Sequence, residues 1–385
     1  MQSVDTMDVI HINSDAELES ACAQWSAKPT LALDTEFMRT NTFYPKLGLL
    51  QVSDGATCYL IDPLRVENWQ AFVDLLANDS ITFILHSAGE DLILLLTSLG
   101  QMPVRLFDTQ LAAAFLGMGF SLSYQALVKE LLDKDVEKDE TRSDWLRRPL
   151  SESQLNYAAL DVRYLHELML KLDNELLASE KQGWFIAECE QQLDIANNSE
   201  SPALWKELYR SISNAWQLDR KGLTYLQRLG YWREQQARRK NKPRSWIVKD
   251  AELFIIASEM AKLEEPCLNR LQQLSGVPKG LLNRQGERLM SVLSQAVDDL
   301  PDGLEERLSP PLSIAQKGTI KAMQHLTREM AEGLKMAPEL LARKRQILSV
   351  LADIEKSGSL VWNGDMSGWR KNLLQAPFEK IVSKA

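Results

Sequence analysis

The chain has 385 residues, of which 45% are hydrophobic and 25% charged, enough to bury the cores of two or three domains. Its four cysteines form no Cys-x-x-Cys pair, which argues against a zinc ribbon and against a disulfide framework. No apolar run is long enough to span a bilayer, and the first residues do not resemble a secretion signal. We therefore expect a soluble cytoplasmic protein with no membrane partner.

The net charge of −9 is divided unevenly between the two halves of the chain. Residues 1–200 contain 14 Lys and Arg against 32 Asp and Glu, a net charge of −18, whereas residues 201–385 contain 30 against 21, a net charge of +9. An acidic half suits a site that concentrates divalent cations, and a basic half suits the binding of a polyanion. The alternative is that surface charge drifts along the chain without a function.

The N-terminal half alternates between strand-like and helix-like patterns, as expected of an α/β layered domain. Short apolar segments bounded by turn residues predict strands at residues 31–34, 47–52, 57–61 and 81–85. Apolar residues at helical spacing predict helices at residues 69–76, from about Glu90 onward, and at 109–117, 123–132 and 152–177. The last of these helices opens with Ser151 and Gln154, which have the spacing of a capping box.

Two polar stretches that contain proline, residues 197–202 and 298–303, divide the rest of the chain. Beyond the first stretch only helical periodicity remains, and the composition shifts toward basic residues and helix formers. We therefore predict one α/β domain followed by two small all-α domains, at residues 1–196, 203–297 and 303–385.

Asp34 and Glu36 stand two residues apart at the end of the first predicted strand. Residues with this spacing project from the same face of a strand, so both carboxylates can point at one place. A cation between them would turn their mutual repulsion into binding free energy. Taken alone, two solvated carboxylates at an exposed strand end explain the pattern at least as well.

Two further segments hold carboxylates that could join this pair. Asp91 lies in the first turn of a predicted helix, at the strand-end edge where open α/β sheets build their sites. The alternative is a carboxylate that only interacts with the helix dipole. Tyr157 and Asp161 are four residues apart and share a helical face, so a phenol and a carboxylate could serve one site. The alternative for this pair is a core tyrosine beside a capped aspartate.

In this order, Asp34-x-Glu36, Asp91 and Tyr157-x-x-x-Asp161 resemble the three exonuclease motifs of the tyrosine-bearing branch of the DEDD superfamily. Four runs within residues 25–180 are similar to the bacterial ribonuclease D family: Asp34-Thr35-Glu36-Phe37, Tyr44-Pro45-x-Leu47-Gly48-Leu49, Phe107-Asp108-Thr109-Gln110 and Asp144-Trp145-x-x-Arg148-Pro149-Leu150. The C-terminal pieces resemble the HRDC (helicase and RNase D C-terminal) domain, at residues 210–295 and, after residue 300, around residues 344–348.

This resemblance implies a ribonuclease H-like fold, a mixed sheet flanked by helices, followed by two HRDC-like domains. It also implies that Asp34, Glu36, Asp91 and Asp161 bind two Mg²⁺ or Mn²⁺ ions and that Tyr157 orients the attacking water. Carboxylate oxygens are the hard ligands that these ions prefer. The expected activity is two-metal-ion hydrolysis of RNA from its 3′ end, with release of 5′-mononucleotides, in the maturation of tRNA precursors and other small structured RNAs. No obligate protein partner is expected.

Several residues are candidates for contacts with the substrate. In the exonucleases that this chain resembles, the positions of Thr35 and Phe37 lie beside the terminal nucleotide, where an aromatic ring could stack on a base. His86 is a further candidate, although a lone histidine at a strand end is more often structural, and Asp108 is expected to belong to the supporting structure. A basic segment with aromatic residues at its margins is the best candidate for RNA binding outside the catalytic half, and cations at a solvated helix end are the alternative. Its cations are Arg233, Arg238, Arg239, Lys240, Lys242 and Arg244.

The sequence is compatible with two other functions. A DNA exonuclease is the first, because the same superfamily handles both polymers and no motif in this chain reads a 2′-hydroxyl group. A non-catalytic RNA-binding adaptor is the second. It would need a missing ligand, and all five catalytic positions are present.

Overall fold

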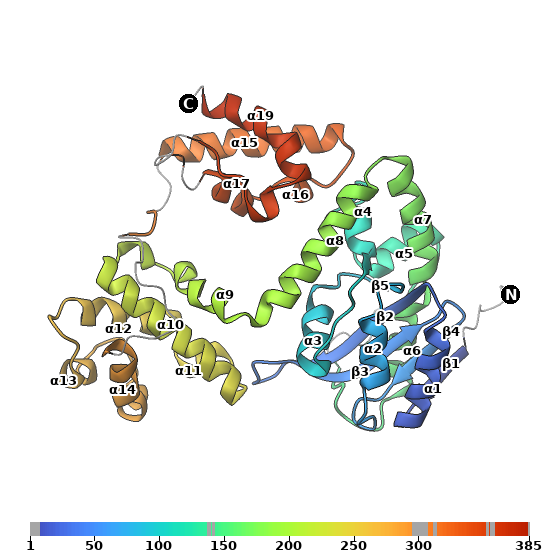
Figure 1. Cartoon of the computed structure of the whole chain (residues 1–385), viewed down its shortest axis with the longest axis horizontal. Helices are drawn as coiled ribbons and strands as arrows, with labels where there is room; N and C mark the ends of the chain where they lie inside the picture. Colours follow the sequence, from blue (N-terminus) through green and yellow to red (C-terminus); the bar gives the residue numbers. More distant parts are fainter. Residues whose placement is uncertain are drawn as a thin grey trace. The chain divides into compact units, whose positions relative to one another are not determined.

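The computed structural model describes residues 8–136, 140, 143–294, 307–310, 314–351, 354 and 359–383 (Figure 1). Its contacts divide the chain into two compact units. Unit 1 comprises Met1–Met38, Lys46–Asn197 and Ser313–Ala385, and unit 2 comprises Arg39–Pro45 and Asn198–Leu312. The break predicted at residues 298–303 lies outside the described residues. No helix among the described residues is both long and apolar enough to cross a membrane.

Unit 1 is built on a six-stranded mixed sheet with the strand order β1-β4-β3-β2-β5-β6. Strands β2 and β3 are antiparallel, as are β3 and β4, and the other neighbours are parallel. The strands are β1 (Asp8–Ile12), β2 (Thr30–Met38), β3 (Lys46–Ser53), β4 (Thr57–Ile61), β5 (Thr82–Leu85) and β6 (Leu106–Asp108). The mostly exposed β1 and the three-residue β6 were not predicted. β6 is too short to show a period, and the apolar residues Val9, Ile10 and Ile12 of β1 were a signal that the prediction missed.

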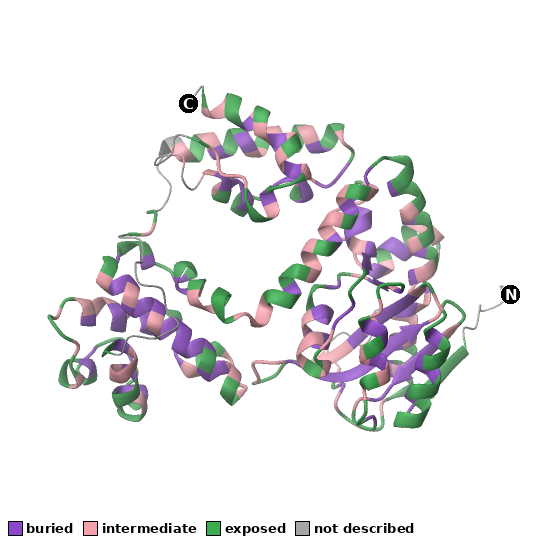
Figure 2. Cartoon of the chain, in the orientation of Figure 1, coloured by how far each residue is buried: buried purple, intermediate pink, exposed green. Residues whose placement is uncertain are grey.

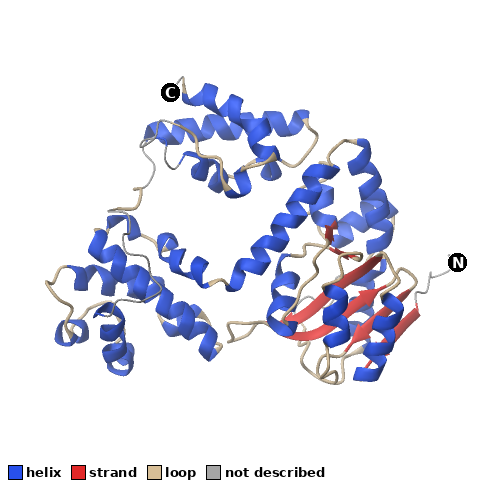
Figure 3. Ribbon diagram, in the orientation of Figure 1, coloured by secondary structure: helices blue, strands red, loops and turns tan. Residues whose placement is uncertain are grey.

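Helices flank this sheet, as Figure 3 shows, and buried residues run along its strands (Figure 2). This arrangement confirms the predicted mixed sheet with flanking helices. Helix α6 packs against β2, β3 and β4, while α3 also contacts β3. The helices are α1 (Asp15–Trp25), α2 (Gln70–Leu76), α3 (Gly89–Leu99), α4 (Thr109–Phe115), α5 (Tyr124–Leu132), α6 (Glu152–Arg163), α7 (Leu165–Ala178) and α8 (Gln182–Asn197).

The single helix predicted at residues 152–177 is two helices, α6 and α7, which meet at Tyr164. The Tyr124 hydroxyl causes the break by inserting into the helical hydrogen-bond ladder. It donates to the Leu160 carbonyl oxygen at 2.8 Å and accepts from the Tyr164 backbone N–H at 3.1 Å, in place of the bond between those two groups. The break leaves Asp161 in the last turn of α6.

Unit 2 is helical, with a core of mainly leucine, isoleucine and aromatic side chains that includes the fully buried Leu226, Ile256 and Leu289. Its long helix α10 (Arg220–Lys240) packs against α12 and α14. The other helices are α9 (Pro202–Glu207), α11 (Arg244–Ile247), α12 (Asp250–Ala261), α13 (Leu268–Gln272) and α14 (Lys279–Ser294), with short 3₁₀ turns η1 (Asn198–Glu200), η2 (Leu208–Ser211) and η3 (Ala215–Gln217).

The C-terminal helices complete unit 1 by packing against α8. They are α15 (Ile314–Gly333), α16 (Pro338–Leu341), α17 (Lys344–Leu351), the 3₁₀ turn η4 (Gly364–Met366) and α19 (Trp369–Val382). The Arg370 guanidinium of α19 forms a two-point ion pair with the Glu188 carboxylate of α8. The rings of Trp369 and Trp184 stack beside it, with their centroids 5.2 Å apart. Within unit 1, α19 is therefore joined to α8 by a buried, partly ionic contact.

Candidate active site

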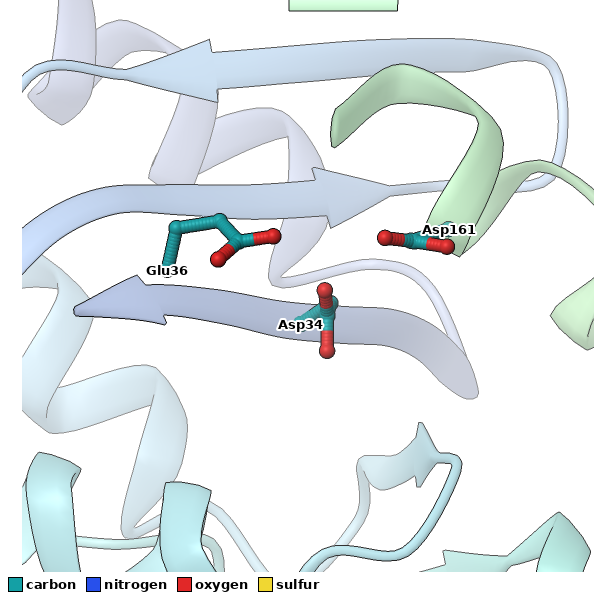
Figure 4. A group of neighbouring side chains, drawn as sticks. All are labelled: Asp34, Glu36 and Asp161. Carbon is teal, nitrogen blue, oxygen red and sulfur yellow. The ribbon is translucent and has the colours of Figure 1, made fainter. Parts of the chain in front are cut away.

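Strand β2 presents Asp34 and Glu36 on the same face of the sheet, because alternate residues of a strand share a face. Helix α6, which packs on β2, β3 and β4, carries Asp161 in its last turn. Carboxylate oxygens of these three residues all lie within 4.8 Å of one another. Figure 4 shows the three carboxyl groups pointing toward a common space. Three of the four predicted metal ligands thus lie together.

Asp91 approaches β2 from the first turn of α3 and is only 8% exposed. Its carboxylate accepts a hydrogen bond from the hydroxyl group of Thr35, which stands between the other two acids on β2. Asp91 lies outside the group of three carboxylates, but its negative charge raises the pKa of both Asp34 and Glu36. The Thr35 hydroxyl, which was predicted to lie beside the substrate, thus donates a hydrogen bond to Asp91.

All four carboxyl groups have raised pKa values, and burial is the largest cause in each case. The pKa of Glu36 rises to about 8, and the pKa values of Asp91 and Asp161 rise to about 7. For Asp34, repulsion from the other three acids adds to burial and holds its pKa well above the ordinary value. Such a cluster is unfavourable when charged, and a divalent cation would compensate it.

Tyr157 lies one helical turn before Asp161. Burial raises the pKa of the Asp161 carboxyl group, and the nearby Tyr157 hydroxyl lowers it in part. Burial raises the pKa of this phenol, and the charges of Asp161, Glu36 and Asp34 raise it further. The hydroxyl therefore keeps its proton at neutral pH. In this environment it can donate and accept hydrogen bonds but is unsuited to removing a proton.

The segment before α6 holds this helix on the sheet, and its residues entered the sequence analysis only through the family resemblance. Trp145 packs directly on Gly48 of β3, where an added Cβ would lie 2.7 Å from the Trp145 Cβ. Arg148 donates to both carboxylate oxygens of Asp62 and to the Gly48 carbonyl oxygen, each at 2.7 Å. The Trp145 ring lies 6.2 Å from the Tyr157 ring, so this segment positions the phenol.

Both ring nitrogens of His86 are engaged within the protein. Nδ1 lies 2.9 Å from the Thr109 hydroxyl oxygen, and Nε2 lies 3.0 Å from the Leu122 carbonyl oxygen. Both nitrogens thus have partners within the protein, which favours the structural alternative, and the substrate contact of His86 stays a prediction. Asp108 caps α4 with its carboxylate, as expected of a supporting residue.

The predicted RNA-binding segment divides into paired and exposed cations. Arg233, which is only 6% exposed, forms an ion pair with Asp250 at 2.6 Å. Arg238 and Arg244 both pair with the buried Glu234 carboxylate. Arg233 and Arg238 are largely buried and committed to carboxylates of unit 2, which leaves little of their charge for phosphate. The exposed cations of the segment are Arg239, Lys240, Lys242 and Arg244, although Arg244 also pairs with Glu234.

We expect the metal-free protein to lose stability as the pH rises from about 5 to about 8. In this window the folded protein keeps protons that the unfolded chain has released, because the carboxyl pKa values of Glu36, Asp91 and Asp161 are raised. Below about pH 4 these carboxyl groups are protonated in both the folded and the unfolded protein, so their contribution to the free energy of unfolding is fully present. It is lost as the pH rises through the raised pKa values of the folded protein. Thermal unfolding in chelator at each pH measures this loss.

Two further measurements test the origin of this pH dependence. Glu36→Gln should flatten it, because the amide does not titrate. Mn²⁺ should restore stability at pH 8 by binding the ionised carboxylates. A melting temperature in chelator that stays constant between pH 5 and 8 would show that the carboxyl pKa values are not raised in the folded protein.

Comparisons with known proteins agree with this fold and this site. A family model described as 3′-5′ exonuclease matches residues 9–177, and a model of the HRDC domain matches residues 223–293. The chain is therefore a 3′-5′ exonuclease joined to an HRDC domain. It is 38% identical to ribonuclease D of Pseudomonas paraeruginosa over 96% of both chains. It is 33% identical to ribonuclease D of Escherichia coli over 97% of this chain and 98% of the relative.

The solved structure of Escherichia coli RNase D, described as an exoribonuclease involved in structured RNA processing, has a TM-score of 0.85 to this chain. The match has 33% identity and covers 98% of this chain and 99% of that structure. The chain belongs to the ribonuclease D family and is a 3′-5′ exoribonuclease of the DEDD superfamily. The exonuclease fold and the acidic cluster imply that it uses divalent metal.

Proposed function

We propose that Asp34, Glu36, Asp91 and Asp161 hold two divalent ions, Mg²⁺ or Mn²⁺, and that Tyr157 completes the catalytic site. The grouping of three carboxylates within 4.8 Å is the observation that carries this proposal. The donor set fits such ions, because all its atoms are hard carboxylate oxygens and no soft thiolate is present among these residues. A hydrogen bond from the Thr35 hydroxyl holds the Asp91 carboxylate beside β2, and Asp91 supplies the fourth negative charge of the site.

When bound, the ions supply activation of a water molecule and neutralisation of the 3′ oxygen that leaves. The protein groups position the reactants. Because the Tyr157 hydroxyl keeps its proton, its oxygen can accept a hydrogen bond from the attacking water. Water attacks the phosphorus of the last internucleotide linkage, and the bond to the 3′ oxygen of the preceding nucleotide breaks. This releases one 5′-mononucleotide and leaves a new 3′-hydroxyl end on the RNA.

We further propose that the substrates are RNAs with 3′ extensions, tRNA precursors among them, and that the enzyme acts in the cytoplasm. Phe37, next to Glu36 on β2, remains the proposed stacking surface for the terminal base. The exposed cations Arg239, Lys240, Lys242 and Arg244 remain proposed RNA contacts. Arg233 and Arg238 are not part of this proposal, because both are largely buried in ion pairs with carboxylates of unit 2.

The product of digestion tests this function directly. A tRNA precursor with a labelled 5′ end and a 3′ extension should shorten one nucleotide at a time in Mg²⁺ or Mn²⁺ and release 5′-mononucleotides. Chelator should stop the reaction. Equal rates on a DNA of matched sequence would favour the DNA exonuclease, and RNA binding without any product would favour the non-catalytic adaptor.

A further inference from the structure

The half of β2 that carries Asp34 and Glu36 is paired with the sheet on one side only. Its parallel pairing with β5 ends at Ala32, so beyond that residue the described ladder holds β2 only through β3. The pairing with β3 shifts register between Glu36 and Phe37 and ends at Met38. Glu36 thus stands next to this register shift, two residues before the end of β2 and close to the loop that follows.

That loop, residues 39–45, is bound by the C-terminal end of α10 within unit 2. The Asn241 side-chain oxygen accepts two hydrogen bonds, from the backbone N–H groups of Phe43 at 3.0 Å and Tyr44 at 2.9 Å. Asn241 is the C-cap of α10 and has a left-handed backbone with φ 46°. Asparagine is one of the few residues that adopt this conformation readily. The residue that caps α10 therefore also binds the loop through its side chain.

Other side chains near Asn241 contact the same loop. The Arg238 guanidinium lies between the Phe43 and Trp205 rings, 4.5 Å and 3.8 Å from their centroids. The Tyr44 hydroxyl donates to Glu200 at 2.6 Å, and Glu200 also pairs with Arg238 at 2.9 Å. Part of the basic segment that the sequence offered for RNA binding thus serves to bind a loop of the same chain.

We propose that Asn241 is a positioning residue for catalysis, which fixes the loop after β2 and thereby the position of Glu36. This inference rests on the proposed metal-binding role of Asp34 and Glu36. The geometry is specific, because one oxygen atom holds two consecutive backbone N–H groups.

Three variants of the full chain test the inference. Asn241→Gly keeps the left-handed cap, which glycine adopts freely, and removes only the oxygen that binds the loop. Asn241→Asp retains an acceptor oxygen at the same place. Gln235→Ala is the matched control, since Gln235 is an exposed residue on the same helix.

We expect Asn241→Gly to lower kcat about tenfold with little change in KM, since misplacing a catalytic group by about 1 Å costs up to 10²-fold. Its affinity for Mn²⁺, measured by calorimetry without RNA, should fall by a similar factor. Asn241→Asp and Gln235→Ala should stay within about twofold of the parent on both measurements. Thermal unfolding confirms that each variant is folded.

Two results would overturn the inference. One is a parental kcat and Mn²⁺ affinity in Asn241→Gly. The other is an equal loss in Asn241→Asp, which would mean that the helix end matters and the acceptor oxygen does not. Asp161→Asn, measured in parallel, separates the two proposals. If it is inactive while Asn241→Gly is normal, only the positioning role fails, whereas an active Asp161→Asn removes the proposed site and this inference with it.

Discussion

Asp161→Asn is expected to lower kcat by at least about 10³-fold, equivalent to the loss of roughly 4 kcal/mol of transition-state stabilisation. The substitution removes one of the three carboxylates that lie within 4.8 Å of one another, and with it charge compensation for the bound cations. RNA affinity should change little, because the exposed cations of unit 2 are untouched. Single-turnover hydrolysis and filter binding with the same labelled RNA measure the two effects separately.

Tyr157→Phe is the companion variant for this measurement. Removing one hydroxyl that orients water should cost about 10²-fold, the lower end of the range for positioned proton-transfer groups. In chelator at pH 8, Asp161→Asn should melt at a higher temperature than the parent, since it relieves repulsion on Asp34 and Glu36. An Asp161→Asn rate within tenfold of the parent would contradict the proposed ligand set.

Arg370→Ala is expected to lower the free energy of unfolding by about 3–5 kcal/mol, the usual cost of removing one partner of a buried ion pair. Arg370 is only 2% exposed, and the substitution leaves the Glu188 carboxylate without its partner. It also removes the donors to the carbonyl oxygens of Leu340 and Asp365, at 2.9 Å and 3.1 Å. Urea unfolding of the full chain measures the loss.

The double variant Arg370→Met with Glu188→Leu distinguishes the lost charge partner from lost packing. Apolar side chains of similar size often replace a buried ion pair at little cost, so the double variant should be more stable than Arg370→Ala. If the two are equally destabilised, packing of α19 rather than the unpaired carboxylate accounts for the effect. An Arg370→Ala protein as stable as the parent would mean that this pair does not hold the C-terminal helices.

Features set by local periodicity could be predicted from the sequence. The spacing of Asp34 and Glu36 placed both on one face of a strand, and the structure has them there. The capping box of Ser151 and Gln154 forms both of its reciprocal hydrogen bonds, at 3.0 Å and 3.1 Å, and starts α6 where expected. The mixed sheet with flanking helices and the exoribonuclease family are confirmed, although only the resemblance linked Asp161 to β2. The division into three domains stays a prediction.

Features that depend on distant partners could not be predicted. The break after α6 requires the Tyr124 hydroxyl, which comes from another helix. A count of charges does not distinguish a cation in solvent from one beside a carboxylate, so Arg233 and Arg238 were assigned to RNA. For Arg238 a local signal existed, because Glu234 lies four residues earlier on the same helical face.

The pairing of α8 with α19 also constrains when the enzyme becomes complete during its synthesis. Arg370 is added 182 residues after Glu188, which at about 5–20 residues per second takes on the order of 10–40 s. Throughout that time Glu188 lacks its cation and the Trp184 ring lacks its stacking partner. Until α19 emerges, the growing chain therefore exposes the surface of α8 that α19 later covers. A chain released before α19 is made keeps this surface accessible to proteases and prone to aggregation.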